Sequence, residues 1–274
     1  MLTRWTGVGF KIIVLLFFTL WTIVPIALVV TNSFKKEMDI FTTTPTLWFT
    51  PTLTNYFNAF SKGDFSLYFI NSTYVAVISS LIAVGFGTFA AYGLTSFRSK
   101  WSNTIANGFL LGKLVPAISM LLPLFTLIRL TGFLGTLVGP IVAHAALNLP
   151  FIIWLLMGFM RDVPKELNDA ATIDGCTKMQ VFWKVVVPII LPGIAAASIL
   201  AMQYSWNELL FSMQLTDMDT YTLPVGISTF VGAISVDWGK SSAAATVTMV
   251  PMIIVGFFVQ KYIAQGTTSG AVKG

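Results

Sequence analysis

The sequence contains little of what builds catalytic or metal centres. Its 274 residues include one cysteine, Cys176, and one histidine, His144. A single cysteine excludes an internal disulfide and says nothing about compartment, so we interpret Cys176 as a small apolar filler. A single histidine with no cysteine nearby in sequence does not form a metal site by itself. We therefore expect His144 to be packed or in contact with water, and no metal to be bound.

Charge is also scarce. Charged residues make up 10% of the chain and hydrophobic residues 55%, and the mean hydropathy is +0.81. Soluble domains carry about 25% charged residues. This composition leaves no room for a separate soluble domain and predicts an integral membrane protein. The net charge of +5 does not indicate nucleic-acid binding, because the basic residues are spread according to membrane topology.

Long apolar segments predict an all-α membrane protein with six transmembrane helices in one domain, residues 1–274. A helix needs about 20 apolar residues to cross a bilayer. The expected spans are about 12–30, 67–97, 103–128, 133–160, 189–211 and 241–263. The first is longer than the core of a signal peptide, about 7–15 residues, and no small-residue cleavage site follows it, so we expect an uncleaved anchor.

The distribution of Lys and Arg predicts the orientation. Six spans place both termini on the same side as the loop at 161–188. If that side is internal, internal segments hold ten of the 16 Lys and Arg residues and external segments hold five, with Lys113 inside a span. The positive-inside rule therefore places the loop and both termini in the cytoplasm.

The loop at 161–188, called here the charged loop, has the highest density of charge in the chain. Eight of the chain's 27 charges lie in 24 residues: Arg161, Asp162, Lys165, Glu166, Asp169, Asp174, Lys178 and Lys184. A spanning helix does not hold this density, because each central charge costs about 2.5–3.5 kcal/mol. The charged loop must therefore lie outside the membrane.

Local signals predict two short helices joined by a bend in this loop. Pro164 suits the first turn of a helix, and Gly175 stands where a left-handed C-cap would end it. Residues 177–180 read as a capping box that opens the second helix. The first helix would have a small apolar face, Leu167, Ala170 and Ala171, and the second an apolar face of Met179, Phe182, Val185 and Val186. Such faces favour a docking surface for a soluble partner over an ordinary solvated loop.

The spacing in this loop matches a known pattern. Asp169-Ala170-Ala171 is followed after three residues by Gly175 and after nine more by Val185-Val186-Val187-Pro188. This resembles the EAA loop of ATP-binding-cassette importer permeases, E-A-A-x3-G-x9-I-x-L-P, with Asp in place of Glu and Val in place of Ile and Leu. The resemblance implies a cytoplasmic coupling helix that docks on an ATPase subunit. It assigns the coupling to Glu166, Leu167, Asp169, Ala170, Ala171, Asp174, Gly175 and Pro188.

Further segments narrow the resemblance. Residues 150–156, PFIIWLL, precede the charged loop, Trp206-Asn207-Glu208 lies in the fifth span, Leu223-Pro224-Val225-Gly226 lies in the last external loop, and residues 269–274 end the chain. Together they resemble the carbohydrate permeases of maltose-type importers. The resemblance implies an ABC type I importer permease architecture and a subunit of an ATP-driven, binding-protein-dependent importer of an oligosaccharide or disaccharide.

The resemblance also implies partners. They are a second homologous permease, two ATP-binding-cassette ATPase subunits, an extracytoplasmic solute-binding protein, the sugar and membrane lipid, in the cytoplasmic membrane of a bacterium or archaeon. The chain itself would be no enzyme and would bind no cofactor, since ATP and Mg would lie on the ATPase subunits. The tripeptide Gly239-Lys240-Ser241 is no phosphate loop, because Ile234 stands where its first Gly should be.

Polar groups in the spans are candidates for the substrate pathway: Lys113, Asn148, Gln203, Tyr204, Asn207 and Glu208. Lys113 either snorkels to the interface or faces a water-filled cavity. Glu208, near the external end of the fifth span, is either an interfacial group or part of the pathway. Polar groups in hydrocarbon need partners, so the fifth span should face other helices or the pathway.

The last segment, residues 264–274, has too little apolar area to fold alone. It is either a disordered end or, as the resemblance suggests, a coupling tail that reaches the ATPase interface through Gly270, Lys273 and Gly274. The alternative for the whole chain is a six-span secondary transporter or channel acting as an oligomer without an ATPase. Such a protein needs an internal ion-coupling site and is favoured by inverted repeats. Few intramembrane charges and no such repeats are visible in the sequence.

Overall fold

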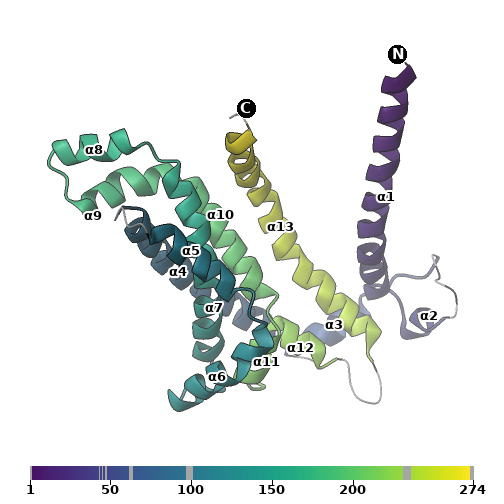
Figure 1. Cartoon of the computed structure of the whole chain (residues 1–274). Helices are drawn as coiled ribbons and strands as arrows, with labels where there is room; N and C mark the ends of the chain where they lie inside the picture. Colours follow the sequence, from purple (N-terminus) through teal and green to yellow (C-terminus); the bar gives the residue numbers. More distant parts are fainter. Residues whose placement is uncertain are drawn as a thin grey trace. The chain divides into compact units, whose positions relative to one another are not determined.

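The structure is a computed structural model that describes residues 2–42, 44, 46, 48–61, 64–96, 101–230 and 236–271. Every element in these residues is a helix (Figure 1). The elements are α1 (Leu2–Ser33), α2 (Glu37–Ile40), α3 (Thr54–Ser61), α4 (Phe65–Ser96), α5 (Ser102–Gly112), α6 (Ala117–Leu130), α7 (Val138–Arg161), α8 (Lys165–Ile173), α9 (Lys178–Val181), the π-helix η1 (Phe182–Val186), α10 (Val187–Trp206), α11 (Leu210–Leu215), α12 (Leu223–Ser228) and α13 (Trp238–Ala271). The chain divides into two compact units, Met1–Ser66 with Gly226–Val250 and Leu67–Val225 with Pro251–Gly274.

The all-α membrane class is confirmed. Within the described residues, five stretches are long and apolar enough to cross a membrane: Gly9–Ser33, Phe65–Ser96, Val138–Arg161, Lys178–Trp206 and Trp238–Phe258. A sixth span exists if the pair Thr104–Gly112 and Ala117–Leu130 is counted as one.

The expectation of one continuous span over 103–128 is corrected to a broken pair. The two helices meet at an angle of 91°. The break lies just before Pro116, whose ψ of 131° is not helical. Proline disfavours helical backbone in the residue before it and lacks the N–H that would continue the helix. The break places Lys113 at the end of α5, on an exposed corner and not in the middle of a straight span.

Two other boundaries differ from the expected ones. Helix α10 ends at Trp206, and a separate helix, α11, begins at Leu210, so Asn207 and Glu208 lie in a break and not inside a span. Helix α13 continues through the segment expected as a tail as far as Ala271. Residues 272–274, with Lys273 and Gly274, lie outside the described residues.

The core of the unit Leu67–Val225 is formed by α4, α5, α7 and α10, which Figure 1 shows bundled together. Ile152, Leu156 and Met157 of α7 are fully buried in it. Glycine permits the close approach of α7 and α10: a Cβ placed on Gly193 would lie 2.5 Å from the ring carbon Cγ of Phe159. Small residues commonly allow membrane helices to pack at this separation.

We expect Gly193→Ala to lower the thermal stability of the purified chain in detergent. The added methyl group has no room, and overpacking costs about 1–3 kcal/mol. Gly158→Ala, on α7 of the same helix pair, is the control, because a Cβ added there would meet no atom within 4 Å and Ala is the better helix former. The midpoint of thermal unfolding, followed by tryptophan fluorescence, measures the effect. Equal midpoints for the two variants would contradict the packing described here.

The unit Met1–Ser66 with Gly226–Val250 is held partly by polar contacts at the end of α1. Ser33 and Tyr56 share a hydrogen bond of 2.7 Å between their hydroxyl groups. Asn55 donates to the backbone carbonyls of Ser33 and Lys35, at 3.0 and 2.8 Å. Within the part of the chain that the structure describes, the most apolar window of α1 has no buried residue. Its side chains are therefore free to meet lipid or another subunit.

Candidate functional site

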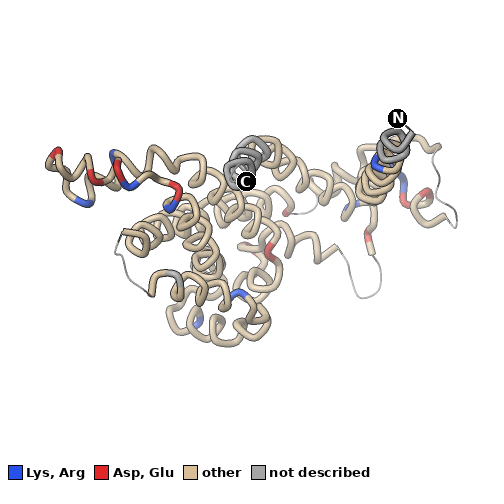
Figure 2. Tube along the Cα trace, turned by 45° about the horizontal axis from the view of Figure 1, so that its top comes forward, with Lys and Arg blue, Asp and Glu red and all other residues tan. Residues whose placement is uncertain are grey.

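The charged loop folds as two helices around a bend, as predicted. Helix α8 begins after Pro164 and ends before Gly175, which has a φ of 86°. Thr177 caps α9: its hydroxyl accepts the N–H of Gln180, and the Gln180 side chain accepts the N–H of Thr177. Gly175 at positive φ and the capping box are both confirmed. Figure 2 shows positive and negative charges gathered along α8 and α9.

The apolar residues of this loop divide into an inner and an outer set. Phe182 and Val186 are buried, and Ala171 and Cys176 pack against the same core, which confirms Cys176 as a filler. Leu167 is 44% exposed and Ile173 86% exposed. These apolar side chains are therefore left uncovered by the residues that the structure describes.

Two details of the loop differ from the sequence interpretation. The predicted apolar face of the second helix is split: Met179 is exposed, whereas Phe182 and Val186 are buried. Ala171 was expected on the docking face but is half-buried against the core. The sequence also did not single out Ile173 or Trp183 as exposed apolar residues. For Met179 and Trp183 the reason is the short α9, because its register is set by the capping box and the π-helix, which a 3.6-residue period does not include.

The π-helix η1 connects the loop to α10. The N–H of Val187 bonds to the carbonyl of Phe182, five residues earlier. Pro188 follows at the start of α10, and in an α-helix its ring would collide with the carbonyl of Lys184. The wider π turn relieves this collision, so the helix runs without a break from Lys178 to Trp206. The Tyr92 hydroxyl also donates to the carbonyl of Lys178, at 3.0 Å, and ties the loop to α4.

A cavity of about 630 Å³ opens where α10 breaks before α11. It is lined by Ala117, Leu200, Gln203, Tyr204, Asn207, Glu208, Leu209, Leu210 and Phe211. Four of the six candidate pathway residues are thus brought together. The Lys113 ammonium lies 4.8 Å from the centre of the Tyr204 ring, beside the same wall. Asn148 lies elsewhere: it is buried and donates to the carbonyl of Ala201 at 3.1 Å, which joins α7 to α10.

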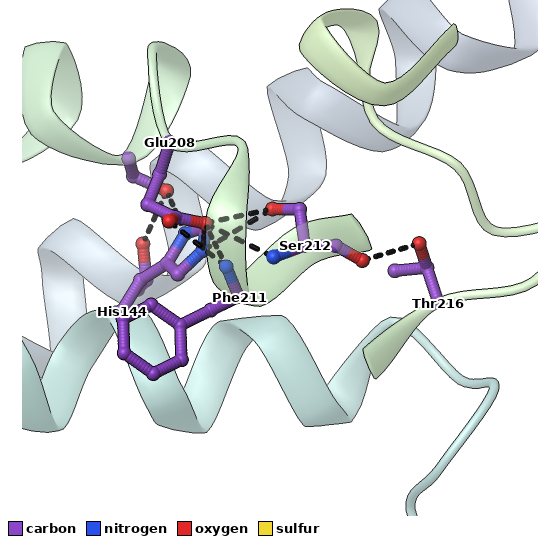
Figure 3. Close-up of polar contacts among 7 residues, drawn as sticks. His144, Glu208, Phe211, Ser212 and Thr216 are labelled. Carbon is purple, nitrogen blue, oxygen red and sulfur yellow. Dashed lines mark hydrogen bonds and ion pairs between the residues drawn. The ribbon is translucent and has the colours of Figure 1, made fainter. Parts of the chain in front are cut away.

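Glu208 also belongs to a buried polar network (Figure 3). His144 of α7 is fully buried, with Nε2 3.0 Å from Oε2 of Glu208 and Nδ1 2.7 Å from Oγ of Ser205. The Glu208 carboxylate also accepts the backbone N–H groups of Phe211 and Ser212. Glu208 therefore caps the start of α11 and is not a solvated interfacial group.

His144 is packed, as expected, but the sequence did not indicate its partners. Glu208 is 64 residues away in the chain, and no local spacing links a histidine to an acid on another helix. Among the described residues no group of three or more His, Cys, Asp or Glu side chains could hold a metal. Ser205, His144 and Glu208 are hydrogen-bonded in series, as the serine, histidine and acid of a hydrolase triad are. Ser205, however, is buried and does not line the cavity. The arrangement is suited to holding groups in place and not to attacking a substrate.

Known proteins resemble this chain both in sequence and in fold. The family described as binding-protein-dependent transport system inner membrane component matches residues 83–269. The sulfoquinovosyl glycerol transport system permease protein of Agrobacterium fabrum is 34% identical over 89% of this chain and 86% of its own length. The trehalose transport system permease protein of Mycobacterium tuberculosis is 36% identical over 82% of this chain and 83% of its own length.

A solved structure has the same fold. It is a bacterial ABC transporter involved in the import of the acidic polysaccharide alginate, with a TM-score of 0.78 over 94% of this chain and 96% of that chain, at 20% identity. Since the family match covers most of the chain and relatives above 30% identity align along nearly all of it, the chain belongs to the binding-protein-dependent transport system inner membrane components.

Proposed function

We propose that the chain is the permease subunit of an ATP-driven importer of an oligosaccharide or disaccharide. The observation that carries the proposal is the charged loop, which exposes the apolar residues Leu167 and Ile173 among charged ones. The relatives support the substrate class: one is named a trehalose permease and another, from Streptomyces coelicolor, a diacetylchitobiose uptake permease.

The charged loop would dock on an ATPase subunit. Leu167 and Ile173 offer apolar contacts, and Glu166, Asp169 and Asp174 surround them with charge. ATP binding would close the ATPase pair and move the loop, and the permease would open to the outside. Each conformation would be favoured by the partner that binds it more tightly, which is alternating access. The chain itself would catalyse no reaction, and ATP and Mg would lie on the partner subunits.

The cavity between α10 and α11 would form this chain's part of the sugar pathway. It combines an aromatic ring, Tyr204, with two amides, Gln203 and Asn207, and the carboxylate of Glu208. Sugar sites commonly need this combination, an apolar surface with a few well-placed hydrogen-bonding groups. The Lys113 ammonium beside Tyr204 adds a positive group at the rim.

The remaining partners follow from this role. A second permease would complete the pathway, and an extracytoplasmic binding protein would deliver the sugar. A bacterial alginate transporter of similar fold has been solved in complex with an alginate pentasaccharide-bound periplasmic protein. Both termini would be cytoplasmic, and the end of α13 with Gly270, continued by Lys273 and Gly274, would couple to the ATPase interface.

Uptake by the assembled complex tests the proposal. The chain is co-expressed with its candidate partner permease, ATPase and binding protein, reconstituted in proteoliposomes, and supplied with radiolabelled disaccharides and internal ATP. We expect uptake to require ATP, the binding protein and the ATPase. Uptake by this chain alone, driven by a proton or sodium gradient, would instead support a secondary transporter.

Gly175 provides a sharper test of the loop. Its Cβ would meet no atom within 4 Å, but its φ of +86° is strained for other residues, by about 1–2 kcal/mol. We expect Gly175→Val to reduce the amount of ATPase that co-purifies with the chain. Gly175→Asn is the matched control, because Asn adopts this conformation readily. Normal recovery of the ATPase with Gly175→Val would show that the bend is not needed for docking.

A further inference from the structure

His144 and Glu208 form a buried polar pair, and Glu208 also lines the cavity. The His144 side chain is 0% exposed and that of Glu208 9% exposed. His144 lies on α7, and Glu208 lies in the break between α10 and α11. Burying an acid and an imidazole is costly unless both are fully hydrogen-bonded. The hydrogen bonds of the two side chains therefore indicate which atoms are held in place and which remain able to bind a ligand.

The bonds define which atoms carry protons. Glu208 Oε2 accepts from the backbone N–H of Ser212 at 3.0 Å and from the Ser212 hydroxyl at 3.2 Å. These donors favour an ionised carboxylate, so the nearby Nε2 of His144 must donate to it. On the other side of the ring, Nδ1 is paired with the Ser205 hydroxyl, which in turn accepts from Ser79 at 3.1 Å. The imidazole is thus held at both nitrogens.

The two oxygens of Glu208 are used unequally. Oε2 accepts from His144 and Ser212 and shares the N–H of Phe211, at 3.2 Å, whereas among the described residues Oε1 accepts that Phe211 N–H alone, at 3.0 Å. A carboxylate oxygen accepts about two hydrogen bonds, so Oε1 keeps acceptor capacity. Glu208 lines the cavity together with Gln203 and Asn207.

We propose that His144 is a positioning residue for sugar recognition: it holds the Glu208 carboxylate so that Oε1 accepts a hydroxyl group of the sugar in the cavity. The inference rests on the proposed function for the identity of the ligand. The contact between His144 and Glu208 does not rest on it. Without His144, the carboxylate would keep its bonds to Phe211 and Ser212 but lose the donor that holds Oε2 from α7.

Because His144 is the chain's one histidine, the contact can be tested by NMR without any sugar. The full chain, with an affinity tag that contains no histidine, is labelled with ring-¹⁵N histidine and placed in lipid nanodiscs. We expect Nε2 to be protonated and its resonance to move in Glu208→Gln, while Gln214→Ala, on the far side of Ser212 in the sequence, leaves it in place. A ring protonated at Nδ1 alone, or an Nε2 signal unaffected by Glu208→Gln, would overturn the contact.

Transport kinetics test the positioning role. The side-chain amide of Gln can replace Nε2–H as a donor to Glu208, whereas that of Asn reaches only the place of Nδ1. In the reconstituted complex, using whichever of radiolabelled trehalose, maltose or diacetylchitobiose is transported, we expect His144→Asn to raise KM about tenfold with little change in Vmax. His144→Gln should recover most of the affinity.

The possible outcomes distinguish a failure of the positioning role of His144 from a failure of the proposed sugar class. Equal KM values for the Gln, Asn and wild-type chains would overturn the positioning role, and so would a loss of Vmax alone in both variants, which indicates a structural role. If the wild-type complex transports none of the three disaccharides, the proposed sugar class fails. In that case the NMR result still decides whether His144 holds Glu208.

Discussion

Replacing Leu167 with Asp is expected to abolish stimulation of ATP hydrolysis by the sugar-loaded binding protein. Leu167 is 44% exposed on α8, the first helix of the charged loop. In the assembled transporter this side chain would be buried against the ATPase. An unpaired carboxylate buried there would cost several kcal/mol, more than a typical docking contact provides.

The matched control is Thr172→Asp, which adds the same charge to the same helix. Thr172 is exposed, five residues after Leu167, and therefore about 140° around the helix from it. The two variants are compared at equal membrane expression, by stimulated ATPase activity and by ATPase co-purification. Similar losses in both would show that added negative charge alone is responsible and that Leu167 makes no special contact.

Replacing Tyr204 with Ala is expected to raise the KM for sugar uptake by about tenfold or more. Its ring lines the cavity, with the Lys113 ammonium 4.8 Å from its centre and the His144 ring edge-on at 6.3 Å. An aromatic ring offers the apolar face of a sugar a large, rigid contact. Losing it removes about 1–2 kcal/mol of binding, which corresponds to roughly a tenfold change.

Tyr204→Phe separates the ring from the hydroxyl group. It retains the aromatic surface and the contact with Lys113, so uptake should remain near the wild-type level. Initial rates over a range of sugar concentrations provide KM and Vmax for each variant. If Tyr204→Ala transports with an unchanged KM, the cavity is not the site through which the sugar passes.

One helix connects the two regions on which these predictions rest. The stretch Lys178–Trp206 carries the charged loop at its beginning and the cavity at its end. At 1.5 Å per residue it is about 43 Å long. The π-helix keeps it continuous across Pro188.

The sequence by itself determined the features that depend on neighbouring residues. Apolar runs of about 20 residues require membrane helices, because the bilayer offers no other partner for backbone groups. The charges of the loop exclude it from the bilayer, Gly175 adopts a positive φ, and Thr177 caps α9 through Gln180. Each of these depends on residues within a few positions along the chain, where composition and spacing are sufficient.

Only the tertiary structure decided which polar side chains of the interior pair with one another and which line the cavity. Asn148 had the same standing as Gln203 in the sequence, yet one joins α7 to α10 and the other lines the cavity. His144 and Glu208 pair across 64 residues of chain. The break at Pro116 brings α6 against the α10–α11 corner, where Ala117 lines the cavity. Which face of a uniformly apolar helix turns inward depends on its neighbours, because lipid and protein interior are equally apolar.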